Sequence, residues 1–222
     1  MKYYGFLRKR GQDPYDFRFE AFILMKLNEK LRSEFENAVW QAVDDGSPAD
    51  GDLLNATFDG FLEIISDEIT GTAITEIGTG AITSSNALEK FRLMWASVDK
   101  AYKEAGTAIL CSHTDYDNYR INYKDTYHQS PVTRPVVDTN YDGIEYEMGG
   151  GRTMIIPIPG LGSSRRVIIT PLDNLVIGID GLNDLNWNVE QDHWSLDLFS
   201  AFRIGVQFRT VESGVLVVND QT

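Results

Sequence analysis

Cysteine is nearly absent from this chain, because only one of its 222 residues, Cys111, carries a thiol. A single cysteine excludes an internal disulfide framework. Cys111 lies in the apolar run GTAILCSH, which predicts a buried strand. We therefore interpret its thiol as a small hydrophobic side chain of the core rather than as a reactive group.

Long hydrophobic runs are also missing. No apolar segment approaches the roughly 20 residues of a membrane-spanning helix. The first residues, MKYYGFLRKRGQDPYDF, lack the continuous apolar stretch of a secretory signal. We therefore expect no membrane partner and no export route.

Positive charge is scarce: 20 Lys and Arg stand against 33 Asp and Glu, which gives a net charge of -13. Nucleic-acid binding depends on basic side chains that neutralise phosphates, so this balance opposes sequence-specific recognition of DNA or RNA. The basic clusters at 8–10 and at Arg165 and Arg166 are too short to reverse it. We interpret both clusters as sites of local contact.

The strongest pattern that is present predicts a long helix over Tyr15 to Val43. This stretch contains neither glycine nor proline, and Pro14 stands where a first-turn proline is tolerated. At about 1.5 Å per residue the helix would be roughly 40 Å long, well above the length of an average globular helix. Its apolar residues recur at spacings of three and four along one face: Leu24, Leu27, Leu31, Phe35, Ala38, Val39 and Ala42.

The middle of the chain predicts a mixed α/β region. A helix is expected over 85–105 with Ser85 or Asn86 as its cap, and the strand TAILCS follows it. The next segment, HTDYDNYRINYKDTYHQ, predicts a helix that begins with Thr114 and Asp117 in capping-box spacing.

The C-terminal part predicts strands. From Trp194 to Phe208 apolar and polar residues alternate, which indicates one strand about three times the usual length. We expect GVLVVND to be its antiparallel partner through the turn ESG. A long helix packed on this long ribbon is the structural centre that the sequence predicts.

Possible ligand motifs are incomplete. The segment Asp138 to Gly143 resembles the start of a calcium loop, but the twelfth position, which needs a carboxylate, holds Gly149. The glycine-rich segments IGTG and PGLGSS lack the residues that would complete a dinucleotide or phosphate site, and we interpret them as turns. We expect no catalytic site, no metal and no cofactor.

Tyrosines also form a pattern, because four of them share one face of the helix expected after Ser112. Packing in the interior is the default interpretation, and a contact between subunits is the alternative, since tyrosine is favoured at interfaces. The four are Tyr116, Tyr119, Tyr123 and Tyr127.

The order of several segments resembles a known family. The long helix ends in SEFENAVWQA, and the segments that follow are FDGFLEII, NALEKFRLMWASVDKAY, AILCSHTDYDNYR, YDGIEYEM, MIIPIPGLGSSRRVIITPLDNLVIGIDGLND and RIGVQFRT. In this order and spacing they resemble the major capsid proteins of tailed bacteriophages, the family with the Hong Kong 97-like fold, in the form found in phages and prophages of Bacteroidetes. The resemblance covers about Phe17 to Asp220.

The resemblance implies an α+β fold with three parts. Residues 1–57 would hold the N-terminal segment and the spine helix of a peripheral domain, and 58–185 an axial α/β domain. Residues 186–222 would form the long ribbon that returns to the peripheral domain. In this arrangement the apolar strand NLVIGI docks in the core, and the polar turn after it faces neighbouring subunits.

The resemblance also implies a function. It predicts a structural virion protein that assembles with other copies of itself, in hexamers and pentamers, into an icosahedral shell around DNA. Scaffolding and portal proteins are the further partners that it implies. The expected locations are the virion and, during assembly, the cytoplasm of the host bacterium. The candidate interface residues are Asn183, Asp184, Tyr116, Tyr119, Tyr123, Arg165 and Arg166.

Two alternatives stay open. An encapsulin-like compartment uses the same fold to enclose protein cargo. A metal-dependent α+β enzyme would use the acidic turn at 138–142 together with His113. Family members also carry an N-terminal arm and an extended loop before the spine helix, whereas only MKYYGFLRKRGQDP precedes it here. We expect either a shortened chain or reduced lattice contacts.

Replacing Asn183 and Asp184 together with alanine is expected to leave folding intact and to weaken association, because both lie in a polar turn that would face neighbours. Thermal unfolding and sedimentation velocity of the double variant check this. Unchanged association, or a chain that no longer folds, would contradict the assignment.

Overall fold

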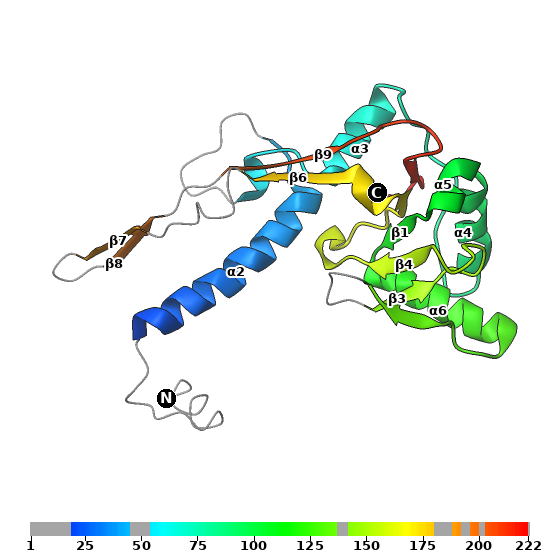
Figure 1. Ribbon diagram of the computed structural model, residues 1–222, viewed down its shortest axis with the longest axis horizontal. Coiled ribbons are helices and arrows are strands. Elements are labelled where there is room, and N and C mark those ends of the chain that lie inside the picture. The colour runs from blue at the N-terminus through cyan, green and yellow to red at the C-terminus, as the bar shows by residue number, and fades with distance from the viewer. Residues whose placement is uncertain are drawn as a thin grey trace. The chain divides into compact units, whose positions relative to one another are not determined.

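The computed structural model describes residues 19–44, 54–136, 142–179, 188–191, 196–199 and 203–221 (Figure 1). Within them the chain is α+β, as the sequence predicts. It divides into two units, residues 1–36 and 37–222, which are described separately below. The predicted domain limits at 57 and 185 stay a prediction.

Helix α2, Phe19–Gln41, confirms the long helix over the described residues, and it crosses the boundary between the units. Among the side chains of this helix that are described in the first unit, Leu27, Leu31 and Phe35 are partly buried, while charged ones such as Lys26 and Arg32 are exposed. Lys30 and Glu34 form an ion pair of 3.3 Å on the exposed side. Packing of this part of the helix on the ribbon stays a prediction.

The second unit holds the other described elements. Its helices are α3 (Phe61–Thr70), α4 (Ala87–Ala96), α5 (Lys100–Ala105) and α6 (His113–Tyr127), with the 3-10 turns η1 (Leu54–Ala56), η2 (Pro159–Leu161) and η3 (Leu172–Asn174). Its strands are β1 (Ala108–Cys111), β2 (Thr133–Pro135), β3 (Asp142–Glu145), β4 (Met154–Pro157), β5 (Ile168–Thr170), β6 (Leu175–Ile179), β7 (Asn188–Gln191), β8 (Leu196–Phe199), β9 (Ile204–Phe208) and β10 (Val217–Val218). None of the described helices has both the length and the apolar character needed to cross a membrane.

A six-stranded sheet organises this unit, in the order β10-β5-β1-β4-β3-β2. Strand β1 lies inside the sheet: it is parallel to β4, with Ile109 opposite Ile155, and antiparallel to β5. All four residues of β1 are buried, which confirms the predicted strand and the interior position of Cys111. Burial raises the pKa of the Cys111 thiol well above its ordinary value, so the thiol stays protonated and inert.

Alternate side chains of the sheet enter two different cores, because successive residues of a strand point to opposite faces. On one face Ile109, Cys111 and Ile155 pack with the apolar residues of α4 and α6. On the other face Leu110 and Ile156 pack with the last turn of α2, with α3 and with β9. The sheet is therefore a middle layer that is covered on both sides.

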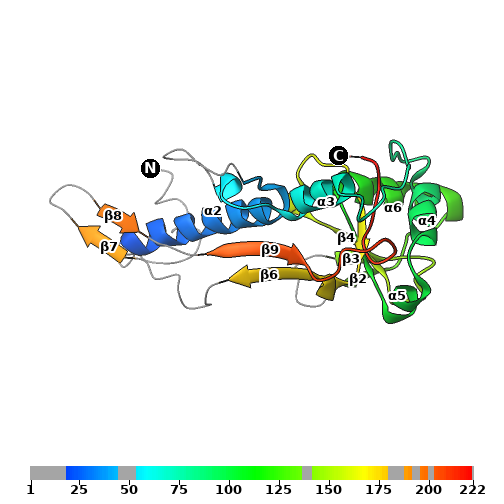
Figure 2. The same ribbon diagram turned by 90° about the horizontal axis from the view of Figure 1, so that it is seen from above.

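The ribbon consists of two antiparallel pairs nested in the sequence, β6 with β9 and β7 with β8 (Figure 2). The predicted partner of β9, GVLVVND, is therefore wrong. Its residues Val217 and Val218 form β10 and pair with β5 in the six-stranded sheet. There the two valines enter opposite cores, a burial that pairing with β9 would not provide. Of the predicted long strand, residues 194–195 and 200–202 lie outside the described residues, and the described remainder includes β8 and β9.

The single helix predicted over 85–105 is in fact two helices, α4 and α5. Leu88, Phe91 and Trp95 of α4 are buried and form the face that packs on the core. The break falls at Ser97 to Asp99, where the N–H of Asp99 donates to the carbonyl of Gly214 at 3.1 Å instead of continuing the helix. Tertiary pairing with the turn before β10 overrides the local helix propensity here.

Helix α6 forms as predicted but has a different cap. Ser112, and not Thr114, is the N-cap, and its hydroxyl accepts from the N–H of Asp115 at 3.2 Å. Ser112 takes this role because it has the extended backbone that follows a strand, which an N-cap residue requires.

Gly60 is required where the chain turns from α2 into α3. Its N–H donates to the carbonyl of Ala42 at 2.7 Å, which fixes the end of α2 against the start of α3. A Cβ at position 60 would lie 2.8 Å from the backbone of Trp40 and of Ala42. The close approach leaves no space for a side chain.

Gly60→Ala is therefore expected to lower the free energy of unfolding by about 1–3 kcal/mol, as overpacking against a rigid backbone does. Gly78→Ala is the matched control, because nothing lies within 4 Å of the Cβ it would add. The control is expected to be neutral or slightly stabilising. Urea denaturation measures both, and equal stability of the two variants would contradict the account.

Candidate subunit interface

The residues predicted to contact neighbouring subunits fall in three places. Asn183 and Asp184 lie outside the described residues. The tyrosines are on α6, and Arg165 and Arg166 are in the segment between η2 and β5. The structure does not bring the tyrosines and the arginines together as one exposed patch.

The tyrosine face of α6 belongs mainly to the interior. Tyr119 is 0% exposed and packs on Phe91, with ring centroids 5.1 Å apart. Tyr116 and Tyr123 are partly buried beside the same core. Burial raises the pKa of Tyr119, so its phenol stays neutral. Interior packing is thus the interpretation that the structure supports for Tyr119, and a subunit contact by this residue stays a prediction without support.

Tyr127, at the end of this face, joins an exposed polar cluster. Arg92 donates to the carboxylate of Glu147 and to the hydroxyl of Tyr127, both at 2.6 Å. The same hydroxyl donates to Glu147 at 2.9 Å. The hydrogen bond with Glu147 raises the pKa of Arg92. The cluster ties α4 to α6 and to the turn after β3 across the surface of the fold.

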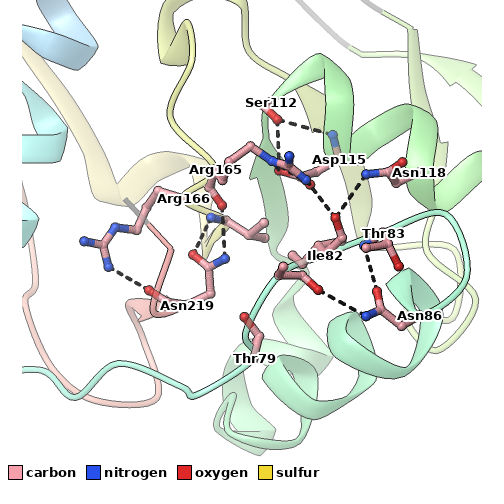
Figure 3. A network of polar contacts seen from close by, with 12 residues as sticks. Thr79, Ile82, Thr83, Asn86, Ser112, Asp115, Asn118, Arg165, Arg166 and Asn219 are labelled. Carbon is pink, nitrogen blue, oxygen red and sulfur yellow. Dashed lines mark hydrogen bonds and ion pairs between the residues drawn. The ribbon is translucent and has the colours of Figure 1, made fainter.

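Arg165 makes an internal ion pair. Its Nε donates to both carboxylate oxygens of Asp115, at 3.1 and 3.0 Å, and its Nη2 donates to the carbonyl of Ile82 at 2.8 Å (Figure 3). Asp115 is fully buried and also accepts from the hydroxyl of Ser112 at 2.9 Å. The hydrogen bonds with Asp115 raise the pKa of Arg165. Arg165 therefore secures the start of α6 to two loops.

Arg166 is buried, and its partners are also within the chain. Its Nη1 donates to the carboxylate of Glu76 and to the carbonyl of Asn219. The side chain of Asn219 in turn accepts from the N–H of Val167 at 2.7 Å and donates to the carbonyl of Arg165 at 3.1 Å (Figure 3). The structure thus gives Arg166 a role within the chain, where it joins Glu76 and the residue after β10, and a subunit contact by Arg166 stays a prediction.

The exposed apolar surface lies where the sequence predicted core. The strand NLVIGI was expected to dock in the interior, yet Val176, Ile177 and Ile179 of β6 are 40%, 50% and 54% exposed. The expectation is wrong for these three residues, whereas Leu175 at the start of the strand packs against the core that holds Val206 and Phe208 of β9. An apolar sequence predicts that a strand is buried, but it does not tell whether the same chain or another one covers it.

No family model matches this chain. No curated protein is recognisably similar to it in sequence either.

Residues 138–141 of the acidic turn in the enzyme alternative lie outside the described residues, so only Asp142 and His113 can be placed. In the described part of the chain no group of three or more His, Cys, Asp or Glu side chains is arranged to hold a metal ion. Asp142 is the first residue of β3, and His113 is the first residue of α6. An open depression beside α6 is lined by Asp117, Arg120, Ile121, Lys124, Ser130 and Pro131, and neither of those two residues lines it.

Arg165→Met is expected to lower the free energy of unfolding by about 2–4 kcal/mol, because it leaves the buried carboxylate of Asp115 unpaired. Adding Asp115→Asn should recover part of this loss, so the two effects should not be additive. Association of the folded chain should be unchanged. Urea denaturation and sedimentation velocity measure the two properties.

Arg209→Met is the matched control. Arg209 pairs with Asp173 at 3.6 Å, and both side chains are mostly exposed, so the loss should stay within about 0.5 kcal/mol. If Arg165→Met weakened association without a loss of stability, Arg165 would be an interface residue after all.

Proposed function

We propose that this protein is a structural subunit that associates with copies of itself to form a closed shell, as the major capsid protein of a tailed phage or prophage with the Hong Kong 97-like fold. The observation that carries the proposal is the surface of β6. Three large apolar side chains of one strand are exposed there, and no described strand pairs with its outer edge. Such a surface serves association rather than chemistry.

The order of the elements supports the proposal. A helix of 23 residues precedes an α/β region with a covered sheet, and a two-stranded ribbon follows near the end of the chain (Figure 1). This is the order of the segments that resemble the capsid family. An isolated two-stranded ribbon is marginal in water, and in the pair of β6 and β9 the buried side chains, Val206 and Phe208, belong to β9. Its stability therefore increases if neighbouring copies cover β6.

Charge supports the same proposal. A net charge of -13 opposes tight adhesion of packaged DNA to the wall. It also makes copies repel one another over most of their surface, which restricts association to uncharged contacts. Scaffolding and portal proteins, and a location in the virion, belong to this proposal as the partners and place that the capsid family implies.

At raised protein concentration and ionic strength the purified chain is expected to form closed shells, because salt screens the repulsion between acidic copies. Sedimentation velocity and electron microscopy at low and high salt measure this. A chain that stays monomeric under every condition would contradict the proposal.

The contents of shells isolated from cells separate two related functions. Packaged DNA supports the capsid, whereas protein cargo without DNA would replace it with an encapsulin-like compartment. Absorbance at 260 and 280 nm, followed by nuclease digestion and gel electrophoresis, distinguishes the two contents.

A further inference from the structure

The sheet edges of the second unit differ in how they are protected. At the β10 edge Ile77 forms a bridge: its N–H donates to the carbonyl of Val218 at 2.8 Å. At the opposite edge β2 carries a charge on Arg134, and Pro135 has no N–H to offer. Covering strands, charges and prolines are the usual means by which proteins prevent edges from pairing.

Strand β6 has none of these protections among the described residues. Its sequence, LVIGI, contains neither a charged residue nor a proline. It pairs only with β9, and β6 and β9 lie side by side (Figure 2). An uncharged, apolar and unpaired edge favours pairing with another strand.

The hydrogen-bonding pattern between β6 and β9 shows which backbone groups of β6 face outward. The N–H of Arg209 donates to the carbonyl of Asn174 at 2.9 Å, so 174 and 209 are a hydrogen-bonded pair. Because such pairs alternate in an antiparallel ladder, Val176 and Gly178 bond to β9, whereas Ile177 and Ile179 direct their N–H and C=O groups outward. The carbonyl of Leu175 also faces outward, while its N–H donates to Leu172.

We propose that β6 pairs antiparallel with β6 of a second copy, about a two-fold axis through Ile177, to form a four-stranded sheet in the order β9-β6-β6-β9. This inference rests on the proposed function in that it names a contact between shell subunits. Ile177 then faces Ile177 of the second copy, and Leu175 faces Ile179. The N–H and C=O of Ile177 meet those of Ile177 in the second copy, and the N–H of each Ile179 meets the C=O of Leu175, which gives about four backbone hydrogen bonds between the copies.

This register is self-complementary, as a two-fold contact requires. A slip of one residue would set outward-facing groups against inward-facing ones, and a slip of two would shorten the pairing. In the proposed register Ile177 and Ile179 of both copies lie on one face, because directly opposite residues point the same way. It is the same face as that of Val206 and Phe208, because Val206 lies opposite Ile177 and Phe208 lies opposite Leu175.

The charge of the protein does not prevent a second copy from approaching at β6. Each copy carries a net charge of -13, so close approach of two copies requires a contact region without charge. The five residues of β6 are such a region, and Asp173 lies beyond its end. Pairing removes from water the apolar area that the single chain leaves exposed on Ile177 and Ile179.

Single cysteines introduced into β6 test the register. In the proposed dimer the two copies of position 177 lie about 5.5 Å apart between Cα atoms, whereas the two copies of position 179 are about 13 Å apart along the strands. Ile177→Cys should therefore be joined between copies by a short thiol-specific crosslinker, and Ile179→Cys should not. The native Cys111 is fully buried and serves as the unreactive background. No crosslink at 177, or an equal crosslink at 179, would overturn the proposal.

A lysine substitution tests the edge without a crosslinker. Ile177→Lys should fold, because the site is half exposed, and should weaken association about tenfold or more, since a lysine at an edge prevents pairing. Val132→Lys is the matched control, because Val132 is 56% exposed beside the β2 edge and should associate as the unmodified chain does. Equal association of both variants, with unchanged melting curves, would contradict the β6 contact.

The inference and the function fail in different ways. If shells form without a crosslink at position 177, the β6 contact is wrong but the capsid proposal still holds. Dimers crosslinked at 177 that never form shells would keep the contact and overturn the capsid proposal.

Discussion

Burial of both faces of the six-stranded sheet is the constraint on which the rest of this structure depends. Adjacent residues of β1, such as Ile109 and Leu110, enter different cores. One core is completed by α4 and α6, and the other needs the last turn of α2, helix α3 and strand β9. Phe61 joins these pieces, with ring centroids 5.2 Å from Trp40 and 4.9 Å from Phe208. The ribbon is thus fixed to the sheet through β9.

This attachment leaves the ribbon supported on one strand only. The apolar side chains of β9 are used inside the chain, whereas Val176, Ile177 and Ile179 of its partner β6 extend into solvent. In a protein of net charge -13 an uncharged strand with an open edge is the surface where like-charged copies approach at the lowest electrostatic cost. Fold and proposed assembly are therefore connected by one feature, the unequal burial of two paired strands.

The sequence predicts local structure better than partners. Periodicity correctly indicates α2, α4, α6 and β1, because each pattern depends on neighbours within the same element. It fails for the partner of β9, since β6 and β10 are equally apolar and only the competition for two cores decides between them. It does not reveal the burial of Arg166 either, because a basic pair has the same sequence whether it faces solvent or pairs with Glu76 within the chain. The exposure of Ile177 could not be predicted either, because an apolar strand has the same sequence whether its own chain covers it or not.

Hydrogen exchange of the ribbon amides tests the central claim most directly. The amides of Val176 and Gly178 bond to β9, so they should be protected at every protein concentration. The amides of Ile177 and Ile179 face outward and should exchange fast in the dilute monomer but slowly in the associated protein. Fast exchange of both amides in protein that has already assembled would contradict the account.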